Sequence, residues 1–214
     1  MIKLIENNGD LEVFCRSLAV EPFITVDLEF LREKTYYAKL CLIQVGSQHE
    51  CAIIDPLAPE MNLQPFFELM DNPQIVKVFH AGRQDLEIIY FMHHRIPAPL
   101  FDTQVAAQVC GYGESVGYET LVKSLLNLEL DKSFRFTNWE ARPLDKRQLE
   151  YAICDVTHLV PIYLKLQDIL KQTGREGWVK EEIEHLSDSS VYETNPLDVW
   201  QKIKHRSHNA RFLT

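Results

Sequence analysis

Two acidic residues interrupt an otherwise apolar strand pattern in residues 23–30, FITVDLEF. The β-branched and aromatic residues of this segment favour a strand, whereas aspartate is depleted from strands. Side chains alternate along a strand, so Asp27 and Glu29 project to the same face. An ionised carboxylate that is removed from water is strongly destabilised unless a partner or a cation compensates its charge. The segment therefore predicts a strand whose two carboxylates face water, pair with Arg or Lys, or bind a cation.

The rest of the pattern predicts an α/β fold. The expected strands are 23–30, 39–47, 50–55, 75–80 and 97–102, and the expected helices are 63–70, 84–94, 103–110, 118–126 and about 145–171. The first three strands are separated by short connections, which favours an antiparallel meander. The later strands alternate with helices, which favours parallel pairing. We therefore expect a mixed five-stranded sheet, an antiparallel meander plus parallel strands, flanked by helices.

Length and composition indicate one globular domain, or one domain plus a short appendage. The chain has 214 residues, of which 46% are hydrophobic and 25% charged, and its net charge is −9. An acidic balance taken alone speaks against nucleic acid, but residues 131–147 carry five basic and three acidic side chains. The chain shows no signal-peptide pattern and no apolar run of membrane-spanning length. We therefore expect no association with a membrane. The five scattered cysteines lack a C-x-x-C pair, so we expect reduced thiols and a cytoplasmic protein.

Four further polar residues indicate a functional site only when they are considered together. Tyr151 and Asp155 lie four residues apart on an expected helix and therefore share a face. Asp85 lies in the first turn of a helix, where a carboxylate stabilises the helix dipole without any further role. Asp102 precedes another helix and is most simply its cap.

Carboxylates from a strand, a strand-to-helix junction and a long helix can converge at one end of a sheet. Hard oxygen ligands of this kind suit Mg²⁺ or Mn²⁺ rather than zinc. Two such ions are a common device for cleaving a phosphodiester bond. The ordinary alternative for each residue is a cap or a salt bridge.

The order of these residues resembles a known superfamily. Asp27-Leu-Glu29, His80-Ala-Gly-Arg-Gln-Asp85 and Tyr151-Ala-Ile-Cys-Asp155 resemble the three motifs of the DEDD 3′→5′ exonucleases, in their Tyr subclass. Longer segments resemble the ribonuclease D family, namely 35–45, 53–58, 79–87, 101–104, 130–134, 138–144 and 151–163. Leu28 departs from that family's pattern, which has threonine at this position. The resemblance implies a ribonuclease H-like fold.

The resemblance also implies a two-metal site that holds Mg²⁺ or Mn²⁺. Its catalytic set would be Asp27, Glu29, Asp85, Tyr151 and Asp155, with the four carboxylates as metal ligands. The Tyr151 hydroxyl would orient the attacking water. The implied reaction trims single-stranded 3′ ends of RNA, such as tRNA precursors or other small structured RNAs, and releases nucleoside 5′-monophosphates.

Substrate contacts are expected on both sides of this site. Residues 132–139, running on to Arg142, interleave basic and aromatic side chains, a combination that single-stranded nucleic acid favours. The predicted contacts are Leu28, Phe30, His80, Trp139 and Arg142. Strict alternation turns Leu28 and Phe30 away from Asp27, so their contact needs a twist or bulge. The structural alternatives are a histidine satisfied at a strand end and aromatic residues that anchor a loop.

Two other functions remain open. A DNA-directed exonuclease could use the same carboxylates, because no residue recognisably reads a 2′-hydroxyl. A non-catalytic module that binds nucleic acid or protein could keep the fold, although it should have lost one or more ligands. For domain organisation, we expect an exonuclease domain at 1–174. Residues 175–214 would form an acidic helix and a linker toward an absent HRDC-type helical domain.

Overall fold

The computed structural model describes residues 2–32, 35–131 and 137–193. Within these ranges the chain forms a six-stranded mixed sheet in the order β1-β4-β3-β2-β5-β6. The strands are β1 (Leu4–Ile5), β2 (Phe23–Leu31), β3 (Lys39–Gly46), β4 (Cys51–Ile54), β5 (Val76–Phe79) and β6 (Leu100–Asp102). The helices are α1 (Asn8–Leu18), α2 (Gln64–Asp71), α3 (Arg83–His93), α4 (Thr103–Val109), α5 (Tyr118–Leu126), α6 (Lys146–Thr157), α7 (Leu159–Thr173), α8 (Glu176–Leu186) and the short 3₁₀ helix η1 (Ser189–Val191).

The predicted topology is confirmed, with one more strand than expected. β2, β3 and β4 form the antiparallel meander, and β5 and β6 extend it in parallel from β2. The sixth strand, β1, pairs in parallel with β4. The prediction of five strands is wrong because a two-residue strand has no periodic signal and depends on its partner. Helix α1 was also missed, although Leu11, Phe14 and Leu18 are buried at helical spacing.

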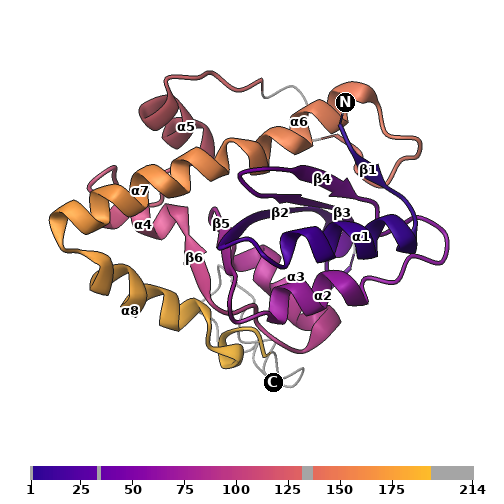
Figure 1. Ribbon diagram of the computed structural model, residues 1–214, viewed down its shortest axis with the longest axis horizontal. Helices are drawn as coiled ribbons and strands as arrows, with labels where there is room; N and C mark the ends of the chain where they lie inside the picture. The colour runs from indigo at the N-terminus through magenta and orange to yellow at the C-terminus, as the bar shows by residue number, and fades with distance from the viewer. Residues whose placement is uncertain (1, 33–34, 132–136, 194–214) are drawn as a thin grey trace, which may run out of the picture.

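The predicted long helix is two helices. α6 ends at Thr157 and α7 begins at Leu159, with His158 between them. Pro161 lies in the first turn of α7 and has no N–H to donate to the carbonyl four residues earlier. The chain can therefore change direction here, and Figure 1 shows α6 and α7 crossing the sheet as successive segments.

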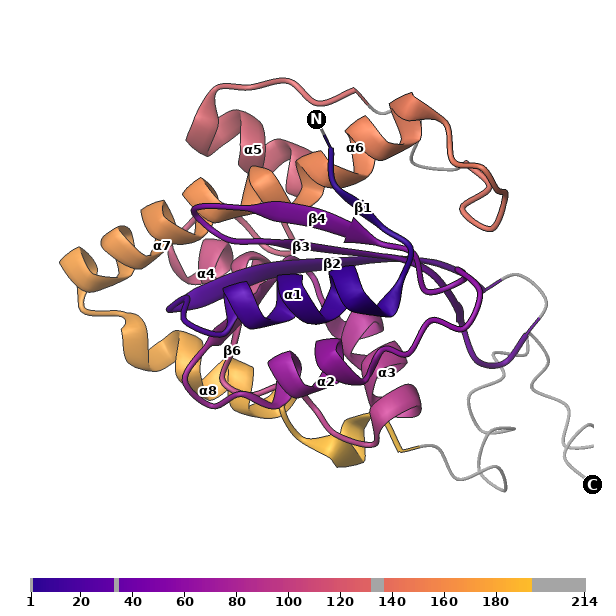
Figure 2. The same cartoon turned by 45° about the vertical axis from the view of Figure 1, so that its right-hand side comes forward.

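Two sets of helices cover the two faces of the sheet (Figures 1 and 2). Along β2, Ile24, Val26 and Leu28 belong to the apolar core that includes residues of α1, α2 and α3. Phe23 belongs to a second core that includes residues of α4, α5 and α7. By alternation, Asp27 and Glu29 lie on the same face as Phe23, which places them under α6 and α7. The side chains of α8 join this second core, so α8 packs on the same body. Among the described helices, none has the length and apolar character needed to cross a bilayer.

Helix α6 lies unusually close to the sheet at its last turn. The Thr25 hydroxyl donates to the carbonyl of Val156 over 2.9 Å and lies 3.2 Å from the carbonyl oxygen of Gly46. Gly46 has no Cβ, and one added there would lie 2.8 Å from Thr25 Oγ1 and 3.3 Å from Val156 Cβ. The close approach therefore requires glycine at this position.

Replacing this glycine tests how α6 is seated. We expect Gly46→Ala to lower the free energy of unfolding by about 1–3 kcal/mol, because the added methyl group overpacks the contact between α6 and the sheet. Urea denaturation measures the change. Gly177→Ala in α8 is the matched control, since a Cβ there meets no atom within 4 Å and alanine favours a helix. Equal stability of Gly46→Ala and wild type would contradict this account.

Candidate metal centre and active site

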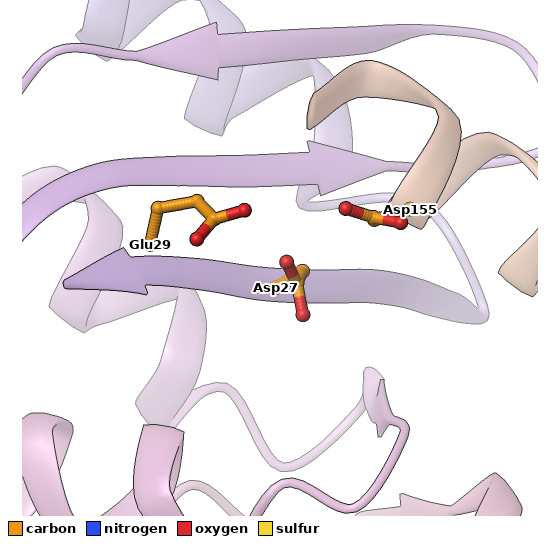
Figure 3. Close-up of side chains that lie close together, drawn as sticks. All are labelled: Asp27, Glu29 and Asp155. Atoms are coloured by element: carbon orange, nitrogen blue, oxygen red, sulfur yellow. The ribbon is translucent and has the colours of Figure 1, made fainter. Parts of the chain in front are cut away.

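Three carboxylates converge between β2 and α6. Asp27 and Glu29 come from β2, Asp155 comes from α6, and one oxygen from each lies within 4.8 Å of the others (Figure 3). Both of the motifs that contribute, D-x-E and Y-x-x-x-D, were singled out from the sequence. The tertiary structure brings them together across more than half of the chain length.

The backbone beside Asp155 is held by hydroxyl groups from two other elements. The Tyr118 hydroxyl, at the start of α5, donates to the Asp155 carbonyl over 2.7 Å and lies 3.2 Å from the Cys154 carbonyl oxygen. The Thr25 hydroxyl holds the next carbonyl, that of Val156. The last turn of α6 is thus fixed from α5 and from β2, which places the Asp155 side chain over the strand.

Asp85 is not a member of this group of three. It is buried in the first turn of α3. Burial raises its pKa well above the usual value, and the charges of Asp27 and Asp102 raise it further. The charge of Asp27 on β2 therefore acts on Asp85 in α3.

Asp102 fixes the loop that leads into α3. Its carboxylate caps α4 by accepting from the N–H of Gln104 over 2.8 Å, as the sequence predicted. The same carboxylate also accepts from the N–H groups of Ala81 and Gly82, over 3.2 and 2.8 Å. The two helix starts are therefore tied together, which determines where α3 presents Asp85.

Asp27 and Asp155 lack a compensating positive charge within the described part of the chain. Burial raises the pKa of Asp27 to about 7. Burial also raises the pKa of Asp155, and the charge of Asp27 adds to this effect. Among the described residues, no lysine or arginine contributes to either shift. Carboxylate oxygens are the ligands that Mg²⁺ and Mn²⁺ prefer, so this donor set fits a divalent metal centre.

A cavity of about 530 Å³ opens over the carboxylates. Its lining includes Asp27, Asp155 and Tyr151, and also Leu28 and Phe30, which strict alternation had turned away. The pairing of β2 with β3 shifts register between Glu29 and Phe30. This irregularity adjoins Phe30, whereas Leu28 keeps its regular pairing with Ile43.

His80 also lines the cavity, at the end of β5. Its Nδ1 lies 3.0 Å from the hydroxyl oxygen of Thr103, within hydrogen-bonding distance. Burial lowers the pKa of the imidazole, which favours the neutral ring. His80 therefore has one structural hydrogen bond and also forms part of the cavity wall.

Trp139 and Arg142 have a setting that differs from the predicted substrate contact. Neither residue lines the cavity. Trp139 is only 3% exposed, and its ring lies 6.1 Å from that of Tyr151. Residues 132–136 of the predicted basic and aromatic segment lie outside the described residues.

The guanidinium of Arg142 is fully engaged within the protein. It donates to both carboxylate oxygens of the buried Asp55, over 2.6 and 2.7 Å. Its other N–H groups donate to the carbonyls of Cys41, Trp139 and Ala141. All five donors of the side chain are used, so none is available for a phosphate. Arg142 anchors the segment before α6 to the sheet.

Sequence reasoning missed part of the cavity wall. Tyr118, Glu119 and Thr120, at the start of α5, also line the cavity. A tyrosine after a glycine at a helix start carries no chemical signal by itself. Its importance follows from its hydrogen bond to the backbone of Asp155, which depends on the fold.

Comparisons with known proteins agree with this geometry. A family model described as 3′-5′ exonuclease matches residues 2–171. A ribonuclease D of Sphingobium indicum is 50% identical over 211 residues, which cover 98% of this chain and 54% of that protein. The chain thus spans about half the length of the curated relatives it matches.

Solved structures give the same result. The Escherichia coli RNase D structure, described as an exoribonuclease involved in structured RNA processing, aligns with a TM-score of 0.89 at 35% identity, covering 94% of this chain and 54% of that chain. The catalytic core of RRP6 from Trypanosoma brucei aligns with a TM-score of 0.80 at 27% identity, covering 87% and 52%. The predicted resemblance to ribonuclease D is confirmed, and this chain belongs to the 3′-5′ exonuclease family.

Proposed function

We propose that this chain is the catalytic part of a metal-dependent 3′→5′ exoribonuclease. It would trim single-stranded 3′ ends of RNA, such as tRNA precursors or other small structured RNAs, and release nucleoside 5′-monophosphates. The observation that carries the proposal is the convergence of Asp27, Glu29 and Asp155 within 4.8 Å at an open cavity. The similarity to ribonuclease D supports RNA as the substrate.

Two divalent ions, Mg²⁺ or Mn²⁺, complete the proposed site. Asp27, Glu29 and Asp155 would hold one ion, and Asp27 together with Asp85 would hold the other, Asp85 directly or through water. When bound, such ions supply a water of lowered pKa and stabilise the charge that develops on the leaving oxygen. The protein's own contribution is to hold these carboxylates close together, where a bound cation would favour their ionised form.

The cavity walls would position the substrate. Tyr151 lines the cavity on the same helix as Asp155, where its hydroxyl would orient the attacking water. Free tyrosine has a pKa of about 10, so we assign positioning rather than proton abstraction to this group. Leu28 and Phe30 would contact the terminal base from the cavity lining, and His80 lines the same cavity.

The alternative functions have less support. A DNA-directed exonuclease would use the same carboxylates, but the curated relatives are ribonucleases. A non-catalytic module should have lost a ligand, and all five motif residues are present. The five cysteines are all unpaired thiols, which supports a reducing compartment such as the cytoplasm.

The direct test uses 5′-labelled single-stranded RNA with Mg²⁺, Mn²⁺ or EDTA. We expect a ladder that shortens from the 3′ end and disappears with EDTA. Asp155→Asn should lower the rate at least about 100-fold. Mutating even a residue that only hydrogen-bonds to a metal ligand typically lowers metal affinity or activity about 10–100-fold. Gel electrophoresis of timed samples measures the rate.

Asp168→Asn is the matched control, since Asp168 is exposed on α7 and should leave the rate unchanged. Single-stranded DNA of the same sequence separates the RNA and DNA alternatives. Internal cuts, or cleavage that is indifferent to EDTA, would refute the proposed reaction.

The proposed role of Tyr151 predicts a selective loss. Tyr151→Phe should lower kcat about 100-fold, the effect of misplacing a reacting group by about 1 Å, while KM stays near the wild-type value. Steady-state kinetics on a short RNA separates the two constants. Tyr112→Phe changes an exposed tyrosine and serves as the control. A rise in KM at constant kcat would instead make Tyr151 a binding residue.

The carboxylate cluster predicts that the stability of the metal-free protein falls as pH rises. Burial raises the pKa of Asp27 from 3.8 to about 7, so the folded state favours the protonated acid. This contribution to stability is complete below about pH 4 and is lost as pH rises through about 7. We expect wild type to lose stability relative to Asp27→Asn over this range.

Urea denaturation in EDTA at several pH values measures the difference between the two proteins. Addition of Mn²⁺ at pH 8 should restore stability to wild type, because a cation that binds the folded state stabilises it. If the free energy of unfolding changed with pH equally in wild type and Asp27→Asn, the pKa of Asp27 would not be raised in the folded protein.

A further inference from the structure

Gln44, in the middle of β3, is a buried polar residue without an evident partner. The residue is 0% exposed. Neither Oε1 nor Nε2 of its side-chain amide has a hydrogen-bond partner among the described residues. Buried polar groups in proteins are almost always hydrogen-bonded, so such a group requires an explanation.

The surroundings of Gln44 do not require an amide. Ile53 lies directly opposite on β4. Leu42, on the same face of β3, packs with Ile53 and with Ala152 of α6. A methionine or leucine would fill this apolar position without leaving a polar group unsatisfied. The glutamine is thus unfavourable in the cation-free protein and should be satisfied in another state.

The other cross-strand neighbour of Gln44 is Asp27. The two residues pair directly in the antiparallel register of β2 and β3. Residues opposite each other in such a pair point to the same face, with Cβ atoms about 4.5–5.5 Å apart. Gly46, two residues further along β3, lies directly under Val156 of α6. The amide therefore lies beneath α6 and next to the first metal-ligand candidate.

We propose that Gln44 is a positioning residue whose amide N–H₂ donates to the carboxylate of Asp27 when a divalent cation is bound. The inference rests on the proposed function, because it takes Asp27 as a ligand. A neutral amide can orient a carboxylate without adding a positive charge that would compete with the cation. Lysine or arginine at this position would offer donors but would also neutralise the ligand.

Replacing the amide with an apolar side chain of similar volume tests this role without using catalysis. In Gln44→Met, Mn²⁺ affinity measured by isothermal titration calorimetry should fall about 10-fold, the lower range for partners of metal ligands. In EDTA the same variant should melt about 2–4 °C higher, because the unsatisfied amide is removed. A residue that only fills the core would not change the two quantities in opposite directions.

Leu42→Met is the matched control, since Leu42 lies on the same strand and face and should keep wild-type Mn²⁺ affinity. Gln44→Leu provides a second apolar replacement if Gln44→Met folds poorly. A measurement on wild type is independent of folding in either variant. The side-chain amide signals of Gln44 in isotope-labelled protein should shift when Mg²⁺ is added.

Two results would overturn the inference and leave the proposed function intact. One is an unchanged Mn²⁺ affinity in Gln44→Met, and the other is Gln44 amide signals that do not shift although Mg²⁺ binds. A wild-type protein that binds no Mn²⁺, and that cannot be distinguished from Asp27→Asn in the titration, would overturn both.

Discussion

The attachment of the last turn of α6 to the sheet is the contact on which the site depends. Hydroxyl groups of Thr25 and Tyr118 hold the carbonyls of Val156 and Asp155. The missing side chain at Gly46 lets the helix approach β3 closely. These contacts place a helical carboxylate over the acidic face of β2, where local sequence alone could not bring it. Since the backbone is held rather than the carboxylate, the acidic side chain remains available for a ligand.

The site gains its chemistry at the expense of the stability of the cation-free protein. Burial that helps to stabilise the surrounding cores raises the pKa values of Asp27, Asp85 and Asp155. A like-charged group of this kind is unfavourable without a cation. The amide of Gln44, which lies beside Asp27 and has no hydrogen-bond partner among the described residues, is unfavourable for the same reason. Local features that conflict with stability are expected where function is located, and here they cluster around one strand pair.

Charged residues near the site divide into two kinds by their partners. Arg142 and Asp55 form a bidentate pair that secures the segment before α6, and Asp102 joins the starts of α3 and α4. These groups have their hydrogen-bonding capacity used within the protein. Asp27 and Asp155 have no compensating positive charge among the residues that the structure describes. Structural groups thus differ from ligand candidates in whether partners within the protein satisfy their hydrogen bonds and charge, and not in residue type.

Short-range periodicity allowed much of this protein to be predicted from its sequence. The two-residue repeat put Asp27 and Glu29 on one face of a strand, the four-residue repeat put Tyr151 beside Asp155, and short connections predicted the meander. Periodicity could not predict β1, which exists through its pairing with β4. A continuous apolar stripe concealed the break between α6 and α7.

Tertiary structure decided which polar residues belong to the site. From sequence, Trp139 and Arg142 had the composition of a nucleic-acid contact, yet the fold buries one and pairs the other. Gln44 interrupts an apolar strand as Asp27 does, but its significance required the strand register. The sequence by itself determined local faces, since a side chain's direction follows from its own backbone. Only the tertiary structure decided which faces meet, because those contacts join residues far apart in the chain.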